Sequence, residues 1–259
     1  MDGRIPDIAR CTLDDFKSVR LQDRVDTKFV VPARIVPGLL EAVSGKYAAL
    51  EIAGEIRHRY ESLYFDTPAF DFYAAHARGR KPRSKVRMRH YCANDLFWLE
   101  HKRKKELRTK KKRIEIGAIA PELSPECLAF LSRFDLPCAP SELRPALWTR
   151  FDRVTLRDLA GTERATVDFG LSVERWLPPD EEGTGRRVDF SPVAIVELKQ
   201  SRVRRDSPLF AELRSRGLAP RSWSKYSVGC SLLVPGLKAN AFKPQRLLLE
   251  RLSGNEVHP

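Results

Sequence analysis

Four short stretches of the chain alternate charged with apolar residues, and this alternation constrains the fold more than any other feature. They are residues 24–29 (RVDTKF), 85–89 (KVRMR), 164–169 (RATVDF) and 196–199 (VELK). Residues two apart in a β-strand share a face, so each stretch predicts a strand with one charged and one apolar face. A single surface strand would alternate in the same way. Several such strands, mostly cationic with a few acids, indicate a sheet curled around a highly anionic ligand.

The charge balance points to the same class of ligand. The 259 residues include 47 Lys and Arg against 34 Asp and Glu, a net charge of +13. Such an excess attracts polyanions: nucleic acid, an acidic membrane surface, or phosphorylated molecules and polymers. A solvated basic surface without a specific ligand is the alternative. We expect no nucleic-acid partner, because the aromatic residues lie in segments 63–66 (LYFD) and 97–100 (FWLE), not interleaved through a basic patch as stacking platforms.

Cysteine usage and hydropathy bear on the compartment. The five cysteines are odd in number and show neither a CxxC motif nor Cys/His metal spacing, which favours free thiols in a reducing compartment. The first residues (MDGRIPDIAR) lack the apolar core of a signal peptide, and no apolar run approaches 18 residues. We therefore expect a cytoplasmic protein. A location at the inner face of the membrane would require a separate membrane-protein partner.

The order of elements predicts an α+β fold. Strands are expected at about 24–31, 55–66, 85–91, 96–104, 110–116, 146–155, 163–175 and 192–200, and helices at 12–20, 32–42, 69–78, 125–134, 208–216, 224–233 and 242–252. This predicts an antiparallel eight-stranded β-barrel or tunnel with helices packed on the outside. Its interior would be wide enough for side chains or a slender ligand. No segment resembles a linker, so we expect one domain over residues 1–259, with its core at about 20–235.

Cations on these strands are the candidate phosphate-binding residues. Phosphate takes forked donors from Arg and point charges from Lys. For any single member, a solvated strand face is an equal alternative. Arg87 and Arg89 stand apart, because two arginines on one face beside Lys85 are hard to explain without an anion between them. The set comprises Lys28, Arg57, Arg59, Arg87, Arg89, Lys102, Lys111, Arg113, Arg153, Arg164, Lys199 and Lys225.

Three acids alternate with these cations. Glu100, Asp168 and Glu197 each have a base two or four positions away on the same strand, namely Lys102, Arg164 and Lys199. Mg²⁺ and Mn²⁺ commonly join one or two carboxylates to substrate phosphates. Glu197 is the metal candidate, because Val196 and Leu198 place the opposite face in the core, whereas Asp168 is expected to orient an arginine. Salt bridges between each acid and its neighbouring base are the alternative.

No covalent nucleophile is indicated. The chain has no GxSxG, Walker or protein-kinase motif, and His58, His76, His90 and His101 show no metal-binding spacing. We interpret these histidines as surface or structural residues. In-line phosphoryl transfer depends mainly on positioning and charge neutralisation, which cations and a metal-holding carboxylate supply.

Six motifs, in order, resemble the VTC domain, the catalytic domain of the vacuolar transporter chaperone polyphosphate polymerases and their bacterial relatives. They are 63–68 (LYFDTP), 85–91 (KVRMRHY), 99–102 (LEHK), 164–168 (RATVD), 196–199 (VELK) and 224–226 (SKY), and the resemblance covers about residues 20–235. It implies membership of the triphosphate tunnel metalloenzymes, whose fold is an antiparallel eight-stranded tunnel with outer helices.

The resemblance also implies an activity. Polymerases of this family transfer the γ-phosphate of ATP to a polyphosphate chain in the tunnel, with Mn²⁺ (or Mg²⁺) as the metal. Glu197 would hold the metal, and Ser224 and Lys225 would contact the nucleotide phosphates or the chain. We assign catalytic roles to Arg87, Arg89 and Lys102, and ATP- or polyphosphate-binding roles to Lys28, Arg59, Lys111, Arg153, Arg164, Lys199, Ser224 and Lys225.

The chain departs from the family at two places. Hydrolytic tunnel enzymes open with a Glu-x-Glu-x-Lys strand, but Arg24, Asp26 and Lys28 occupy those positions here, which favours building a polyanion over hydrolysing one. Fungal polymerases carry a basic residue where this chain has Ser222. Because no phosphate-sensing SPX domain or membrane segment accompanies the motifs, a bacterial-type stand-alone form is expected. A tripolyphosphate or nucleoside triphosphate hydrolase and a non-catalytic polyphosphate-binding module remain alternatives.

Overall fold

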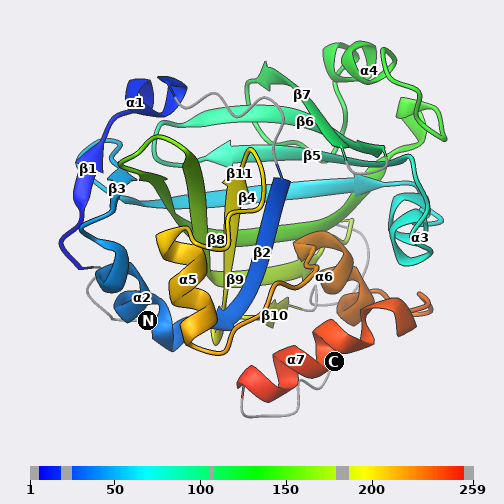
Figure 1. The fold of residues 1–259 in the computed structure, drawn as a ribbon. Coiled ribbons are helices and arrows are strands. Elements are labelled where there is room, and N and C mark those ends of the chain that lie inside the picture. The colour runs from blue at the N-terminus through cyan, green and yellow to red at the C-terminus, as the bar shows by residue number, and fades with distance from the viewer. Residues whose placement is uncertain (1–5, 19–24, 106–107, 179–186, 254–259) are drawn as a thin grey trace.

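The computed structural model describes residues 6–18, 25–105, 108–178 and 187–253, and one large sheet dominates it (Figure 1). Eight strands are hydrogen-bonded in the order β2-β11-β9-β8-β4-β5-β6-β7. Every pair along this path is antiparallel. The strands are β2 (Val25–Pro32), β4 (Arg57–Asp66), β5 (Arg83–Tyr91), β6 (Leu96–Lys105), β7 (Arg108–Ile116), β8 (Arg144–Asp158), β9 (Glu163–Arg175) and β11 (Val193–Gln200).

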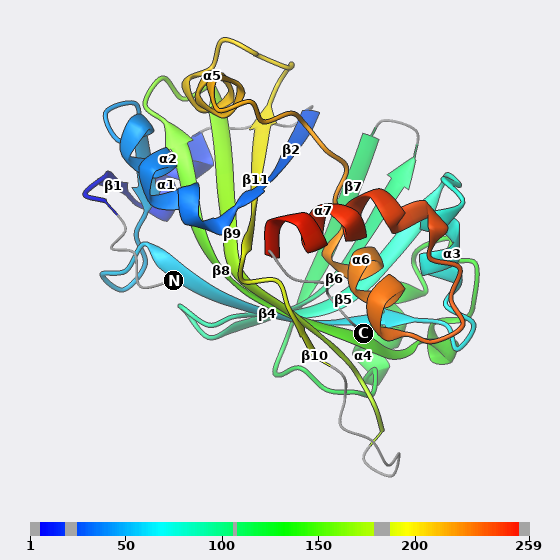
Figure 2. The same cartoon turned by 90° about the horizontal axis from the view of Figure 1, so that it is seen from below.

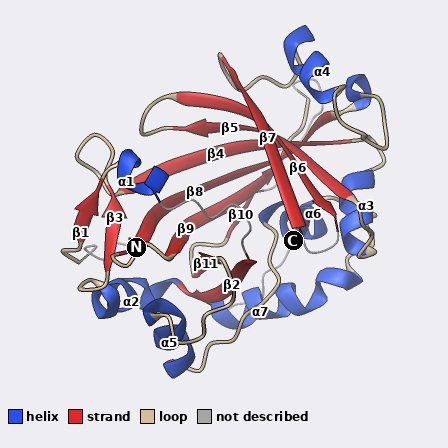
Figure 3. Ribbon diagram, turned by 45° about the horizontal axis from the view of Figure 1, so that its top comes forward, coloured by secondary structure: helices blue, strands red, loops and turns tan. Residues whose placement is uncertain are grey.

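The sheet is strongly curled, as Figures 2 and 3 show. The path begins at β2 and ends at β7, and these two strands are not paired with each other in the part of the chain that is described. The curl still brings Lys28 on β2 close enough to Lys102 on β6 for the two charges to interact. We call the concave face of this curled sheet the trough. The expected antiparallel eight-stranded tunnel with outer helices is confirmed, and the seam between its first and last strands carries no ladder.

Three short strands were missed by the sequence reading. They are β1 (Ala9–Cys11), β3 (Tyr47–Leu50) and β10 (Arg187–Asp189). β1 pairs in parallel with β3, β3 pairs with β8, and β10 pairs with β9. Segments of three or four residues are too short to show a period in sequence, so only the sheet that they join reveals them.

Helices cover the outer face and fill one end of the trough (Figure 2). They are α1 (Leu13–Ser18), α2 (Val36–Val43), α3 (Asp71–Ala77), α4 (Pro125–Leu131), α5 (Pro208–Ser215), α6 (Lys225–Leu233) and α7 (Lys243–Ser253), with 3₁₀ turns at Ala33–Ile35, Pro140–Glu142 and Asn240–Phe242. α2 and α5 pack on the outer faces of β2, β11, β9 and β8, and α4 packs outside β4, β5 and β6. α6 and α7 share a second core with residues of the inner face. No helix in the described ranges is long and apolar enough to cross a membrane.

The apolar halves of the alternating strands form the outer core. Val167 and Leu198 are fully buried against Leu39 of α2 and its neighbours. Phe29 meets Phe210 of α5 edge to face, with ring centroids 5.2 Å apart. Burying one such side chain contributes about 1.5–3 kcal/mol, so this face fixes the strand register. Because the register is fixed, the residues that alternate with these buried ones face the trough.

A glycine lets α6 approach the sheet closely. A Cβ at Gly229 would lie 2.7 Å from Leu147 Cδ2 on β8 and 3.2 Å from Val173 Cγ1 on β9. A larger residue would therefore push the helix away from both strands. This contact sets the N-terminus of α6, where Ser224 caps the helix by accepting a hydrogen bond from the Ser227 N–H.

Candidate functional site: a cationic trough

Strand alternation lines the trough with charged side chains from seven strands and one helix N-terminus. The apolar neighbours of these residues lie in the outer cores. With the exception of Arg59, every residue assigned a catalytic, ligand-binding or metal role from sequence belongs to this lining. The charged members are Asp26, Lys28, Lys85, Arg87, Arg89, Glu100, Lys102, Lys111, Arg113, Arg153, Arg164, Asp168, Glu197, Lys199 and Lys225.

Glu100 anchors the cations of β5 and β7. Its side chain is 1% exposed. It accepts hydrogen bonds from Arg87 Nε (2.8 Å) and Nη2 (2.6 Å), and from Lys111 Nζ (2.9 Å). Burial acts to raise the pKa of Glu100, but Arg87, Arg89 and Lys111 hold it well below its ordinary value. Glu100 is therefore ionised, and its hydrogen bonds fix the direction of the Arg87 guanidinium.

Asp168 plays a similar part on β9. Arg153 Nε and Nη2 donate to its two oxygens at 2.6 and 2.9 Å, and Lys225 Nζ of α6 donates to the same carboxylate. Although burial acts in the opposite direction, Arg153 and Lys225 hold the pKa of Asp168 below its ordinary value. The expectation that Asp168 orients an arginine is confirmed.

The bases that pair with these two acids come from neighbouring elements, which corrects part of the sequence reading. Same-strand spacing had suggested Lys102 for Glu100 and Arg164 for Asp168. The sheet instead sets Glu100 opposite Arg87 and Arg113, and Asp168 opposite Arg153. Residues directly across a ladder are closer than residues two apart along a strand, so the cross-strand partners prevail.

Glu197 is held more loosely. Its two oxygens lie 3.4 Å from Lys28 Nζ and 3.2 Å from Lys199 Nζ, and its side chain is 15% exposed. Burial acts to raise the pKa of Glu197, but Lys199, Lys28 and Lys102 keep it well below the ordinary value. The salt bridge between Glu197 and Lys199, which the sequence offered as the alternative to a metal role, is present. These contacts are longer than the 2.6–2.9 Å hydrogen bonds of Glu100, so Lys28 and Lys199 are held less tightly than Arg87 and Lys111.

Arg89 is the most enclosed arginine of the trough. It is 5% exposed, and its Nε donates to Ser62 Oγ at 2.9 Å. Its guanidinium carbon lies 5.4 Å from the Tyr60 ring centroid and 5.6 Å from that of Phe151. An arginine over aromatic faces keeps its charge in a fixed plane. Arg87 is braced in the same way by Tyr64, whose hydroxyl accepts from Arg87 Nη1 at 2.8 Å.

Lys85, Lys102 and Lys225 carry depressed pKa values. Burial, followed by the charge of Lys28, lowers the pKa of Lys102 to about 8. Burial also lowers the pKa of Lys225 to about 8 and that of Lys85 well below its ordinary value. Crowded, desolvated ammonium groups disfavour one another, so an incoming polyanion relieves this strain. Lys85 was noted only as a neighbour of Arg87, yet it lies on the same face, and alternation alone would have included it.

Arg59 lies apart from the other residues with an assigned role, on the opposite face of the sheet. It lies opposite Asp152 and shares the outer face of β4 with Leu63 and Phe65, which are buried in the core under α4. Its Nη1 lies 3.5 Å from Asp152 Oδ1. The alternation of Leu63 and Phe65 with Tyr64 contained this information, because a residue two or four positions from a core residue shares its face.

Arg164 faces the trough at its far end. Its guanidinium carbon is 5.5 Å from the ring centroid of Phe16 in α1, and its strand neighbours are Arg157 on β8 and Lys199 on β11. Arg164 is therefore separated along β9 from the Asp168–Arg153 pair. Arg24, the first residue of the departure from the Glu-x-Glu-x-Lys pattern, lies outside the described residues.

The donor set fits a metal that takes most of its ligands from water and phosphate. No group of three or more His, Cys, Asp and Glu converges within the described ranges. Glu197 nevertheless presents a carboxylate to the trough, and Asp26 lies diagonally across the β2–β11 ladder, opposite Lys199. Mg²⁺ and Mn²⁺ are commonly bound by one or two carboxylates together with substrate phosphates. Glu197, with Asp26 on the same face, could hold such an ion.

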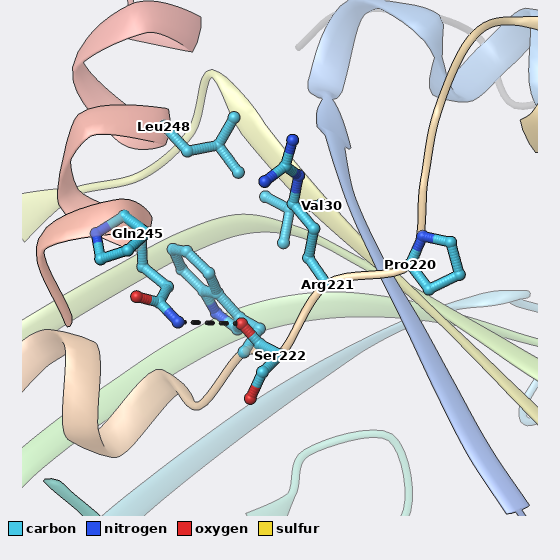
Figure 4. A pocket seen from close by; sticks show the side chains of 8 residues that line it. Val30, Pro220, Arg221, Ser222, Gln245 and Leu248 are labelled. Carbon is cyan, nitrogen blue, oxygen red and sulfur yellow. Dashed lines mark hydrogen bonds between the residues drawn. The ribbon is translucent and has the colours of Figure 1, made fainter. Parts of the chain in front are cut away.

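A small cavity of about 220 Å³ adjoins the trough beside α7 (Figure 4). Arg221 and Ser222 line it, and the Ser222 carbonyl accepts a hydrogen bond from Gln245 Nε2 at 3.3 Å. The Arg221 N–H donates to the Lys28 carbonyl at 2.7 Å, which fixes this loop against β2. Arg221, which precedes Ser222, is exposed.

Comparisons with known proteins agree with this architecture. The family model of the VTC domain matches residues 23–234, and no curated protein matches the chain. A candidate adenylyl cyclase from Hippeastrum, described as having a dominant triphosphatase activity, is 20% identical with a TM-score of 0.50 over 83% of this chain and 99% of that one. Candidate adenylate cyclases from Bacillus halodurans (14%, TM-score 0.46, 78% and 96% covered) and Vibrio parahaemolyticus (13%, 0.44, 78% and 95%) are also similar.

The solved structures show a similar fold, whereas the family is identified by the VTC model. It runs from the start of β2 to the end of α6, so it includes all eight strands of the trough and the helix that supplies Lys225. The matched segment is most of the 259 residues. The chain belongs to the VTC domain family and has the triphosphate tunnel fold.

Proposed function

We propose that this protein is a metal-dependent polyphosphate polymerase, which transfers the γ-phosphate of ATP to a polyphosphate chain lying in the trough. The observation that carries the proposal is the convergence of lysines and arginines on one enclosed face, with Arg87 and Arg153 each oriented by a buried carboxylate. Preorganised cations are what phosphoryl transfer requires, because they stabilise charge without rearranging during the reaction.

In this proposal, the residues of the trough have separate roles. Arg87 and Arg89 hold the reacting phosphates in fixed planes, since Glu100 and Ser62 set their directions. Lys102 and Lys225, with pKa values of about 8, gain charge when phosphate enters. Lys28 and Lys199 turn from Glu197 to the chain. A divalent ion at Glu197 would neutralise charge on the transferred phosphoryl group.

Two other functions share the trough. A tripolyphosphate or nucleoside triphosphate hydrolase is the second candidate, favoured by the shared fold of the Hippeastrum protein with its described triphosphatase activity. A non-catalytic polyphosphate-binding module is the third, favoured by the fact that Glu197 already has two lysine partners.

One assay separates the three. The purified protein is incubated with ATP and Mn²⁺, and ADP, free phosphate and polyphosphate are measured together. A polymerase forms polyphosphate with about one ADP for each phosphate incorporated. Free phosphate without chain growth would identify a hydrolase. Tight polyphosphate binding with no turnover under any divalent metal would identify a binding module.

A further inference from the structure

A chain of hydrogen bonds leads from Lys85 out of the trough to a histidine with no role in the site described above. Lys85 Nζ donates to Ser224 Oγ (2.6 Å), Ser224 Oγ donates to Ser227 Oγ (3.2 Å), and Ser227 Oγ lies 2.5 Å from His76 Nδ1. These residues come from β5, α6 and α3, which lie far apart in sequence. The fold alone assembles the chain.

With Lys85 as an ammonium ion, the donors and acceptors of the chain follow one order. A lysine ammonium can only donate, so Ser224 Oγ accepts and its own hydrogen is directed to Ser227. The Ser227 hydroxyl, having accepted, donates to His76 Nδ1. His76 must then be neutral, with its hydrogen on Nε2. The four groups form one ordered chain.

The surroundings of His76 keep it in that state. Burial, followed by nearby cations, lowers the pKa of His76 to about 2, so the ring stays neutral at ordinary pH. The cations that act on His76 are Lys85, Arg83, Lys104 and Lys28, and those that act on Lys85 are Lys102, Lys28, Arg83 and Arg87. The ring is also fixed by Phe242, with centroids 5.5 Å apart.

Helix capping does not account for the whole chain. Ser224 caps α6 by accepting from the Ser227 N–H, and this needs only the Ser224 side chain. The Ser227 hydroxyl, in a fully buried residue, and the imidazole of His76 are not required for the cap. Their alignment with Lys85 calls for another explanation.

We propose that Ser224, Ser227 and His76 form a relay that positions the Lys85 amine, so that His76 sets the phosphate affinity of the trough without touching phosphate. The proposal rests on the proposed function in that phosphate is the ligand. When His76 Nδ1 accepts the Ser227 hydrogen, Ser227 Oγ can accept the Ser224 hydrogen. A lone pair of Ser224 Oγ then remains to accept from the Lys85 ammonium. Two N–H groups of Lys85 then remain for the ligand. Without the acceptor, the Ser227 hydrogen turns back to Ser224 and competes with Lys85.

The first test follows the amine itself and needs no phosphate. The protein is labelled with ¹⁵N at lysine Nζ, and Lys85→Met identifies the Lys85 signal. Because an acceptor stabilises the ammonium, the pKa of Lys85 should fall in His76→Leu. It should return in His76→Asn, whose side-chain oxygen can replace Nδ1. Ser231→Ala, in the same helix but off the chain, should leave it unchanged. An unmoved Lys85 titration in His76→Leu would overturn the relay.

The second test measures tripolyphosphate affinity. His76→Leu should raise the dissociation constant about tenfold, the usual cost of one hydrogen bond to a charged group. In a Lys85→Met background the same change should have no further effect, since the two residues act through one chain. Equal losses in both backgrounds would contradict the relay. Ser227→Ala offers the same comparison if His76→Leu does not fold.

The Lys85 titration and the phosphate assays also distinguish failure of the relay from failure of the proposed function. If the Lys85 titration moves in His76→Leu but the unaltered protein binds no tripolyphosphate, the coupling of His76 to Lys85 stands, whereas its effect on phosphate affinity and the proposed function are both wrong. If the protein makes polyphosphate but Lys85 titrates identically in both forms, the proposed function stands and the relay is wrong.

Discussion

The two arms of the curled sheet hold their carboxylates in different ways. On the β5–β7 arm, Glu100 is 1% exposed and accepts hydrogen bonds of 2.6–2.9 Å from Arg87 and Lys111. On the β2–β11 arm, Glu197 is 15% exposed and lies 3.2–3.4 Å from two lysines. The first carboxylate is committed to its partners, whereas the second can exchange them.

This difference assigns the acids separate tasks. A buried carboxylate that accepts two hydrogen bonds from one arginine positions that arginine, and losing it leaves an uncompensated charge. A carboxylate met by flexible ammonium groups can accept a metal when phosphate draws the lysines away. The trough is therefore rigid where we propose that arginines bind phosphate and adaptable where we place the metal.

Removing the arginine of the rigid arm should have the largest effect. Arg87→Ala should lower phosphoryl transfer by at least about 10³-fold, because the charge aimed at the reacting phosphate is lost. The rate of polyphosphate formation from ATP and Mn²⁺ measures this, with thermal unfolding as a check on folding. Arg87→Lys retains a charge and should recover part of the rate. A normal rate in the alanine variant would show that Arg87 lies outside the reaction site.

Removing the negative charge of Glu100 should mainly lower the stability of the fold. Glu100→Gln should lower the free energy of unfolding by roughly 3 kcal/mol, since Arg87 and Lys111 lose their buried counter-charge. The depressed pKa of Glu100 means that its contribution is present above its ordinary pKa of 4.5 and is lost as pH falls below that value. Urea unfolding at pH 7 and pH 4 should show the deficit shrinking in acid. Glu115→Gln, at an exposed residue, is the matched control. An equal loss of unfolding free energy in that variant would contradict the role of Glu100 as the counter-charge of Arg87 and Lys111.

Two other lysines of the trough, Lys102 and Lys225, should make phosphate binding depend on pH. Lys102 and Lys225 have pKa values of about 8, so they are charged below that pH and lose charge above it. A bound polyanion favours the charged forms, so affinity should fall about tenfold as pH rises from 7 to 9. Calorimetric titration with tripolyphosphate measures the fall. Lys102→Met should flatten the profile, while an identical slope in that variant would rule out Lys102 as a source.

A change on the outer face should have the smallest effect. Arg59→Ala removes a cation that contacts Asp152, so polyphosphate formation should stay within about twofold. Steady-state rates for this variant beside Arg87→Ala compare the two faces of one sheet. A loss approaching that of Arg87→Ala would mean that charge, not its placement in the trough, governs the reaction.

Strand alternation predicted the fold and most of the lining, because it depends only on positions within one strand. It could not predict the partners of Glu100 and Asp168, since these depend on which strands are neighbours. Arg59 shares the outer face of β4 with Leu63 and Phe65, and the alternation of these residues in the sequence already indicated that face. The relay to His76 could not be foreseen, because its members meet only when α3 and α6 pack together at the end of the trough.

The central claim is that Glu197 holds a metal jointly with phosphate while Glu100 does not. Free Mn²⁺ can be measured by electron paramagnetic resonance in the presence of tripolyphosphate for the unaltered protein, Glu197→Gln and Glu100→Gln. Glu197→Gln should weaken Mn²⁺ binding by at least about tenfold, as expected for loss of a charged ligand, and folded Glu100→Gln should bind Mn²⁺ nearly as the unaltered protein does. Unchanged Mn²⁺ binding in Glu197→Gln would contradict the account.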